Sequence, residues 1–556
     1  MERNKLIFKF WPFAILFFFT ILIAWPLFLP GYFSHHDDLQ VMRIFEMRKC
    51  IEDLQIPCRW VPDMGYGNGY PLFNYYSVFP YYIGATASYL VGFVGSAKLI
   101  FFLAVSFAGI SMYFFVRELF GTYPALTASA LYMFAPYRAL DIYVRGAIAE
   151  SFSIAIIPLV FFFALKLIKH DQQRFRIGLT LSFAAFLLSH NIMIILFLPV
   201  IISILFIWYW KKNFKTIKTL VISLFLGFCL SAFFIVPAYM EQNLVQIDNL
   251  VRFSLDFRGH FINLYQLFLD RSWGYGVSST GTADTMSFQI GWPHYFLVIA
   301  SVFSLLVIKR KERKLIMFNL VLLAAFVFSL FMTHVRSAFI WEQIGILRFV
   351  QFPWRFLSVA IFTASLLGAF FVYSLKESFV KITVALLILS AIILNVSYFK
   401  PQQFIFNLTD EEKLSGQLWE TQQKAAILDY LPVGALEPRE SAPLKPAILA
   451  GDAVIKNFQN RSNSWHFQAN VTDSAIVEVP IFDFPNWQVF ANGKKINHSN
   501  KNYLGRISFT LPSGEYFVVG KFNNTLVRTV SNTISLISIF ILIGRPLYEK
   551  SRRNNK

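Results

Sequence analysis

Uncharged apolar runs close to the length of a membrane crossing recur along the whole chain. About 20 apolar residues in helical conformation cross the hydrocarbon core of a bilayer. Of the 556 residues, 56% are hydrophobic and 15% are charged, which lies outside the usage of soluble globular proteins. We therefore predict an all-α polytopic membrane bundle with twelve spans, at residues 10–30, 98–116, 122–137, 151–165, 177–190, 192–210, 219–239, 287–308, 315–333, 356–375, 382–399 and 529–544.

The net charge of +18 follows this topology. Seven segments beside the spans contain 24 of the 50 Lys and Arg residues but 6 of the 32 Asp and Glu residues, so that 26 of each sign remain elsewhere. Basic residues beside a span resist translocation, so we predict that these segments and both termini are cytoplasmic. The excess charge is a topology signal, and we expect no nucleic-acid partner. The seven segments are 1–9, 117–121, 166–176, 211–218, 309–314, 376–381 and 545–556.

Four outer loops follow from this arrangement, at residues 31–97, 138–150, 240–286 and 334–355. The segment 79–94 is apolar enough to cross a bilayer, but counting it as a span would place the basic segment 166–176 outside. We therefore expect 79–94 to be a separate helix that lies in the outer leaflet or re-enters it.

The composition changes after residue 400. Charged residues, Asn, Pro and Gly return, and alternating stretches such as Ala475–Pro480 are separated by turn signals such as Asn492-Gly493. This pattern is typical of antiparallel strands. We predict a transmembrane domain at 1–399, an extracytoplasmic β-rich domain at 400–526, and a final span with a basic cytoplasmic tail at 527–556.

Two adjacent carboxylates, Asp37 and Asp38, follow the first predicted span in the stretch Ser34-His35-His36-Asp37-Asp38. A carboxylate at a membrane surface can act as general base on a sugar hydroxyl, or hold a cation that bridges a phosphate. His36 is a candidate metal ligand, although four adjacent residues cannot all face one ion. The alternative is a polar cluster that ends one helix and caps the next.

The second outer loop concentrates charge. Arg138, Asp141 and Arg145 would share one face of a helix because they lie three and four residues apart. Two arginines can clamp a phosphate, and carboxylates such as Glu150 can orient them. Tyr137 precedes the set. A self-neutralised ion network at the membrane surface is the alternative.

Further candidates lie in or beside the outer loops. Arg348 and Arg355 flank aromatic residues in the fourth loop, which suits a lipid phosphate, but arginines that snorkel to the interface explain them as well. His190 ends a predicted span, where a histidine is more often structural than catalytic. Cys50 and Cys58 share the first loop and can pair, but their spacing does not decide it.

The order of these parts resembles the GT-C superfamily of integral-membrane glycosyltransferases. Members have an acidic pair in a long first outer loop, a membrane-hugging segment that starts with Tyr-Pro, two spans and a second charged outer motif. The matching parts here are Asp37-Asp38, Tyr70-Pro71, spans 98–116 and 122–137, and Arg138 to Glu150. Many relatives have Asp-x-Asp or Glu-x-Asp where this chain has adjacent aspartates, which leaves open which carboxylate is the base.

More narrowly, the chain resembles bacterial YfhO-like proteins and the membrane family labelled pyruvoyl-tetrahydropterin-synthase-related. The similarity runs through Pro136-Tyr137-Arg138, Asp429-Tyr430-Leu431-Pro432 and Phe484-Pro485-Asn486-Trp487. The label is no evidence of pterin chemistry, since the sequence has no soluble zinc-binding core.

The resemblance implies transfer of a hexosyl or pentosyl group from a polyprenyl-phosphate donor to an envelope polysaccharide or a teichoic-acid-like acceptor, outside the bacterial plasma membrane. No cofactor is required and a divalent metal is optional. The implied roles are Asp37 or Asp38 as catalytic base, Arg138, Arg145, Arg348 and Arg355 at the donor phosphate, and Tyr137, Asp141, Glu150 and His190 as orienting groups.

Two other functions compete with this one. A lipid-linked-sugar flippase or transporter would have internal repeats and a polar path at mid-membrane depth, and the sequence has no evident sign of either. A non-catalytic envelope protein that binds polysaccharide through its β domain would not need twelve spans for anchoring.

Overall fold

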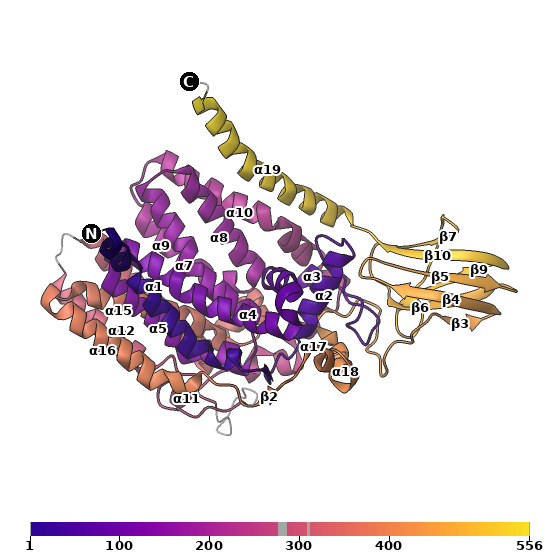
Figure 1. Ribbon diagram of the computed structural model, residues 1–556, viewed down its shortest axis with the longest axis horizontal. Helices are drawn as coiled ribbons and strands as arrows, with labels where there is room; N and C mark the ends of the chain where they lie inside the picture. Colours follow the sequence, from indigo (N-terminus) through magenta and orange to yellow (C-terminus); the bar gives the residue numbers. More distant parts are fainter. Residues whose placement is uncertain (1, 276–285, 309–311, 555–556) are drawn as a thin grey trace.

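The computed structural model describes residues 2–275, 286–308 and 312–554. A helical part and an elongated β domain lie side by side, joined by residues 400–446 and by the start of the last helix (Figure 1). Parts of the predicted outer loop 240–286 and of the predicted cytoplasmic segment 309–314 lie outside the described residues.

Each predicted span coincides with a helix. Within the described residues, eight apolar helical segments have the length and composition to cross a membrane, whereas α9 and α12 are shorter apolar helices. The helical class is therefore confirmed, while the count of twelve spans stays a prediction. The helices are α1 (Glu2–Ala24), α4 (Phe79–Phe120), α5 (Thr122–Phe134), α7 (Ile148–Lys169), α8 (Gln173–Ser189), α9 (Met193–Tyr209), α10 (Phe214–Met240), α12 (Trp292–Val307), α13 (Arg313–Thr333), α15 (Leu357–Ser374), α16 (Glu377–Asn395) and α19 (Leu526–Asn554).

Short helices connect them in the loops. They are η1 (Trp25–Phe28), α2 (Gln40–Glu52), α3 (Leu72–Tyr75), α6 (Pro136–Ala139), η2 (Leu140–Val144), η3 (Gln242–Leu244), η4 (Ile247–Val251), η5 (Phe253–Leu255), η6 (Phe257–Gly259), α11 (Leu264–Phe268), η7 (Val335–Ser337), α14 (Ala338–Gln343), η8 (Gly345–Val350), η9 (Pro353–Phe356), η10 (Val396–Tyr398), α17 (Asp410–Lys413), α18 (Gly416–Lys424) and η11 (Ile427–Asp429).

Helix α4 joins two segments that the sequence analysis treats separately. It runs for 42 residues and contains the predicted outer segment 79–94 together with the span 98–116. The helix is broken at Gly92, whose φ of 72° favours glycine. The carboxylate of Asp410 accepts hydrogen bonds from the backbone N–H groups of Phe93 (2.6 Å) and Val94 (2.8 Å). Asp410 thus caps the second arm, so the two arms are one element with a break.

The β domain, which the alternating pattern predicts as antiparallel strands, is a sandwich of two antiparallel sheets. One sheet has the strand order β4-β5-β10-β7-β8 and the other β3-β6-β9. Buried aromatic residues, including Trp465, Phe467 and Phe509, stack between the sheets. The strands are β3 (Ala447–Ala450), β4 (Ala453–Asn460), β5 (Ser464–Val471), β6 (Ala475–Phe482), β7 (Trp487–Ala491), β8 (Lys494–Ile496), β9 (Arg506–Leu511) and β10 (Gly514–Phe522).

The segment before these strands packs on the helical part. Strand β2 (Phe404–Phe406) pairs antiparallel with β1 (Gly31–Phe33), which follows the first helix. Helices α17 and α18 and the turn η11 continue over the same outer loops (Figure 1). The chain that leaves α16 therefore returns to the first outer loop before it enters the β domain.

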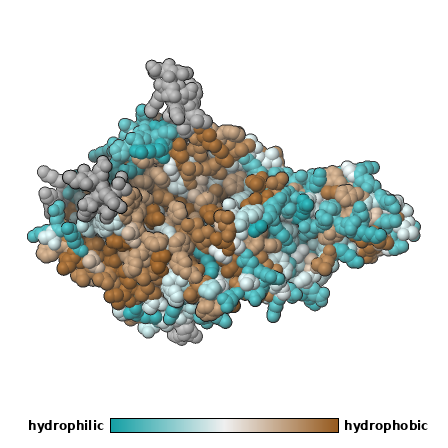
Figure 2. All heavy atoms as spheres, viewed as in Figure 1, coloured by the Kyte–Doolittle hydropathy of each residue, from teal (hydrophilic) through white to brown (hydrophobic). Residues whose placement is uncertain are grey.

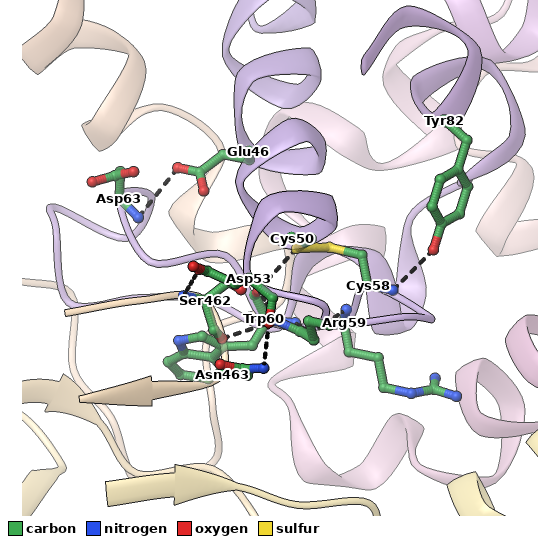
Figure 3. The surroundings of a disulfide bond; sticks show 11 residues. Glu46, Cys50, Asp53, Cys58, Arg59, Trp60, Asp63, Tyr82, Ser462 and Asn463 are labelled. Atoms are coloured by element: carbon green, nitrogen blue, oxygen red, sulfur yellow. Dashed lines mark hydrogen bonds between the residues drawn. A yellow bond between two sulfur atoms is a disulfide. The ribbon is translucent and has the colours of Figure 1, made fainter. Parts of the chain in front are cut away.

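A disulfide bond joins Cys50 to Cys58, a pairing that the sequence left open (Figure 3). Beside it, the Asp53 carboxylate accepts a hydrogen bond from the backbone N–H of Ser462 (2.7 Å), and its carbonyl oxygen accepts one from the Asn463 side chain (3.0 Å). The first outer loop is thereby attached to the β domain. Disulfides persist in oxidising compartments, in agreement with the predicted outer position of this loop.

The surface of the helical part is largely apolar (Figure 2). Large hydrophobic side chains such as Phe225, Phe303 and Ile393 are more than half exposed there. Hydrophilic residues gather on the β domain and at the rim of the helical part. An exposed apolar surface of this extent is typical of helices that a bilayer covers.

Candidate functional site

A cavity of about 920 Å³ lies where the outer loops meet the ends of α8, α9 and α10. Its walls come from segments far apart in the sequence: all four outer loops, the connection between α8 and α9, and the turn η11. The polar residues that line it include His36, Asp37, Arg43, Tyr76, Arg145, Glu150, His190, Asn191, His260, Gln351, Arg355 and Asp429.

The first and second outer loops are hydrogen-bonded to each other at this cavity. The backbone N–H of Asp37 donates to the carbonyl oxygen of Arg145 (3.0 Å), and that of His36 donates to the carbonyl oxygen of Val144 (2.9 Å). These two bonds hold the two loops edge to edge. Both loops therefore contribute to the lining of one cavity.

Gly146 makes this close approach possible. Its φ is 67°, and a Cβ atom there would lie 2.2 Å from Nδ1 of His35. The Gln40 side chain donates to the Gly146 carbonyl (2.8 Å) and to the Asp37 carboxylate (3.0 Å). Only glycine fits this position without displacing the first loop.

The two adjacent aspartates have different surroundings. Asp37 lines the cavity and forms a salt bridge of 2.6 Å with Nη1 of Arg43. Asp38 does not line the cavity and instead forms a salt bridge of 2.7 Å with the buried Lys413 of α17, while His35 lies 3.8 Å away. The structure thus distinguishes the two carboxylates that the sequence could not separate.

Glu150 is the centre of an ion network in the cavity wall. It accepts hydrogen bonds from Nη1 of Arg145 (2.7 Å), Nε of Arg355 (3.2 Å) and the hydroxyl of Tyr137 (2.5 Å). Arg145 also binds Asp141 (2.5 Å). Burial raises the pKa of Asp141 and the negative charge of Glu150 raises it further, while Arg145 opposes both effects. These groups fix the two arginines in place.

Arg145 and Arg355 lie against a stacked aromatic pair. The guanidinium of Arg145 is 4.5 Å from the Trp354 ring, and that of Arg355 is 5.0 Å from the Phe352 ring. Among the described residues, the hydrogen bonds of Arg145 come from Nη1 and those of Arg355 from Nε and Nη1. A guanidinium has five N–H donors, so both arginines retain donors for an anion.

The other two candidate arginines lie outside the cavity. Arg138 is buried and donates to the backbone carbonyls of Ser151 (3.2 Å) and Ala104 (3.3 Å). Arg348 is half exposed and lies 4.0 Å from Asp248. Neither residue lines the cavity.

Both candidate histidines line the cavity. Nδ1 of His190 is buried and has no hydrogen-bond partner among the described residues. Nε2 of His36 lies 2.5 Å from the carbonyl oxygen of Tyr275. Within residues 2–275, 286–308 and 312–554, no group of three or more His, Cys, Asp or Glu residues is placed to hold a metal ion. A divalent metal stays an optional prediction.

Asp429 is a cavity residue that sequence reasoning missed. It belongs to η11, and the next residue, Tyr430, stacks on Tyr75 at 5.4 Å. Burial raises the pKa of Asp429 to about 7, with Arg43 lowering it and Asp37 raising it. The motif around Asp429 was noted, but it was assigned to the β domain and not to the site. Arg43 was also missed, although it follows Asp37 by six residues and forms a salt bridge with it.

The remaining wall is apolar and belongs to α8, α9 and α10. Leu198, Phe228 and Tyr239 both line the cavity and are exposed on the outside of the helices. The cavity therefore reaches the surface that a bilayer would cover. It combines a charged end under the outer loops with an apolar end between helices. The other apolar lining residues in this wall are Phe183, Leu187, Ile192, Ile194, Ile195, Ile235 and Ala238.

Residues 73–402 match the model of a family described as "6-pyruvoyl-tetrahydropterin synthase related domain; membrane protein". The chain belongs to this family. The matched region includes the second and fourth outer loops and the helices α4 to α16. Asp37 and Asp429 lie outside the region through which membership in this PTPS-related family is established.

Two solved structures are similar to this PTPS-related protein. The arabinofuranosyltransferase AftD from Mycobacteria has 13% identity and a TM-score of 0.47, over 70% of this chain and 27% of AftD. ArnT from Cupriavidus metallidurans, bound to undecaprenyl phosphate, has 11% identity and a TM-score of 0.31, over 67% of this chain and 78% of ArnT. The chain thus spans about a quarter of the length of AftD. No curated protein matches the sequence.

Proposed function

We propose that the protein is a glycosyltransferase of the bacterial plasma membrane, which moves a sugar from a polyprenyl-phosphate donor to an acceptor on the outer side. One observation carries the proposal: the cavity has a charged end under the outer loops and an apolar end that reaches the lipid-facing surface of α8, α9 and α10. A lipid-linked sugar phosphate likewise has a charged, polar end and an apolar end.

The donor phosphate is assigned to the pair Arg145 and Arg355. Both guanidinium groups line the cavity, and Glu150 and the aromatic pair fix their positions. The polyprenyl chain would lie along the apolar wall and leave through the gap marked by Leu198 and Tyr239. Donors that are fixed before the reaction stabilise charge on the leaving phosphate with little reorganisation.

The catalytic base is assigned to Asp37. The acceptor hydroxyl oxygen attacks the anomeric carbon, the bond between that carbon and the phosphate oxygen breaks, and the hydroxyl proton passes to the Asp37 carboxylate. Polyprenyl phosphate leaves with its negative charge held by the two arginines. Arg43 orients the carboxylate, and Asp429 faces the same space and can hold a second acceptor hydroxyl.

The chain offers a matched pair of variants for the test. Asp37→Asn and Asp38→Asn remove the same charge from adjacent positions, but only Asp37 lines the cavity. We expect mass spectrometry of envelope glycans to show a product that depends on the gene, is lost in Asp37→Asn and persists in Asp38→Asn. A normal glycan profile in cells with equal amounts of the Asp37→Asn protein would contradict the assignment.

A further inference from the structure

A second pocket lies at the other end of α8 and α10. The large cavity is lined by the C-terminal halves of these helices, whereas this pocket of about 200 Å³ is lined by their first turns and by Ile541 and Leu542 of α19. Charge asymmetry predicts that this end is cytoplasmic. The pocket is thus separate from the proposed catalytic site, and the inference below does not depend on the proposed function.

Each helix contributes one continuous face. The lining positions on both helices recur three and four residues apart, which is the spacing of side chains on one helix face. The Thr180 hydroxyl donates to the Ser223 carbonyl (3.0 Å) and joins the two walls. The lining residues are Gln173, Arg176, Ile177 and Thr180 on α8, and Lys215, Lys218, Thr219, Ile222, Ser223 and Leu226 on α10.

The pocket changes from basic to apolar along these faces. Arg176, Lys215 and Lys218 lie in the first two turns of α8 and α10, at the end of the helices. Ile222 and Leu226 follow on α10, one and two turns deeper, opposite α19. A phospholipid has this sequence of a charged phosphate and an apolar chain. Topology signals explain basic residues at helix ends, but not their alignment with an apolar groove.

The basic end of the pocket contains positive charges that no carboxylate neutralises among the residues whose side chains the structure describes. Arg176 binds Asp171 (2.6 Å), but Lys215 and Lys218 have no carboxylate within ion-pair distance among the residues whose side chains the structure describes. Two helix N-termini point to the same place, since α8 begins at Gln173 and α10 at Phe214, and their partial positive charges add to the attraction for an anion. Oε1 of Gln173, a lining residue, is buried without a hydrogen-bond partner among the described residues.

We propose that this pocket binds an anionic glycerophospholipid of the cytoplasmic leaflet. Its phosphate contacts Lys215, Lys218 and Arg176, and an acyl chain lies along the apolar side chains of α10 and α19. Basic pockets between transmembrane helices at the cytoplasmic side favour such headgroups. The lipid would join α19, which follows the β domain, to the α8–α10 pair.

The test is native mass spectrometry of the purified full-length protein, titrated with phosphatidylglycerol or with the zwitterionic phosphatidylcholine. We expect one retained phosphatidylglycerol adduct and at least tenfold weaker retention of phosphatidylcholine. The double variant Lys215→Gln/Lys218→Gln should weaken retention of the adduct about 25-fold, since each basic residue near a headgroup contributes about 1 kcal/mol, or roughly fivefold.

The matched control is Lys211→Gln/Lys212→Gln. These exposed lysines precede α10 and carry the same charge, but they do not line the pocket. The control should bind phosphatidylglycerol as the wild type does, and both double variants should elute as the same monodisperse species. Equal loss of the adduct in both double variants, equal retention of the two lipids, or displacement of the adduct by millimolar inorganic phosphate would overturn the proposal.

Discussion

The backbone N–H of Asp37 donates a hydrogen bond of 3.0 Å to the carbonyl oxygen of Arg145. This bond joins the loop after the first helix to the loop before α7. It places a carboxylate and a guanidinium on adjacent walls of one cavity, as transfer from a lipid phosphate requires.

The arginines of the cavity wall should differ in effect from Arg348. Loss of one fixed donor to a transition-state charge typically lowers kcat by about 100- to 1,000-fold. We expect Arg355→Gln to reduce transfer in membranes by this order, and Arg348→Gln, outside the cavity, to retain near wild-type transfer. Arg145→Lys keeps the positive charge beside Glu150 but removes the planar guanidinium, so it separates the effect of the charge from that of the guanidinium donors. Equal effects of Arg348→Gln and Arg355→Gln would remove the phosphate assignment.

Transfer should depend on pH through Asp429. Its pKa is raised to about 7, so the carboxylate loses its proton as the pH rises through neutrality. If the ionised form holds the acceptor, the rate rises between about pH 6 and pH 8. Asp429→Asn should remove this rise, whereas Asp38→Asn should keep it. A pH profile of Asp429→Asn that matches the wild type would show that another group titrates.

Gly146→Ala should separate the two outer loops. A Cβ atom would lie 2.2 Å from the His35 ring, and the positive φ strains any other residue. We expect a loss of stability of about 1–3 kcal/mol and a marked loss of transfer. Gly259→Ala is the control, because no atom lies within 4 Å of the Cβ position. Thermal unfolding of the two variants in one detergent measures the difference.

Removal of the disulfide should loosen the junction with the β domain. A loop closed over eight residues stabilises the folded chain by about 2–3 kcal/mol in the chain-entropy description. We expect Cys50→Ser/Cys58→Ser to lower the melting temperature and to expose the region of Asp53 and Ser462 to protease. Cys229→Ser leaves the disulfide intact and should behave as the wild type. If the double variant resists protease equally, the junction is held by its hydrogen bonds alone.

The helices and strands could be predicted because the solvent around each segment, lipid or water, determines its pattern of apolar and polar residues. Apolar runs and charge asymmetry predicted every helix of the proposed spans, and period-two alternation predicted antiparallel strands in the C-terminal part, although not their division into two sheets. The break in α4 was not predicted, since it depends on Asp410, more than 300 residues away, reaching the backbone beside Gly92. A contact of that separation leaves no local pattern.

The site could be predicted only in part. Helical spacing placed Arg138, Asp141 and Arg145 on one face, but the π-helical segment Leu140–Val144 inserts an extra residue per turn. Arg138 therefore turns into the core while Arg145 reaches the cavity. Asp429 was missed for another reason: composition assigned its segment to the β domain. Contacts between residues far apart in the sequence, such as the pairing of β1 with β2 and the salt bridge between Asp38 and Lys413, bring that segment back to the first loop.

That strand pair also sets an order of events during biosynthesis. β1 emerges from the ribosome with the first helix, whereas β2 and Asp429 follow the synthesis of α16. A nascent chain that has inserted all the earlier helices still has an unfinished cavity. The transfer proposed above would therefore begin only after β2 has paired with β1.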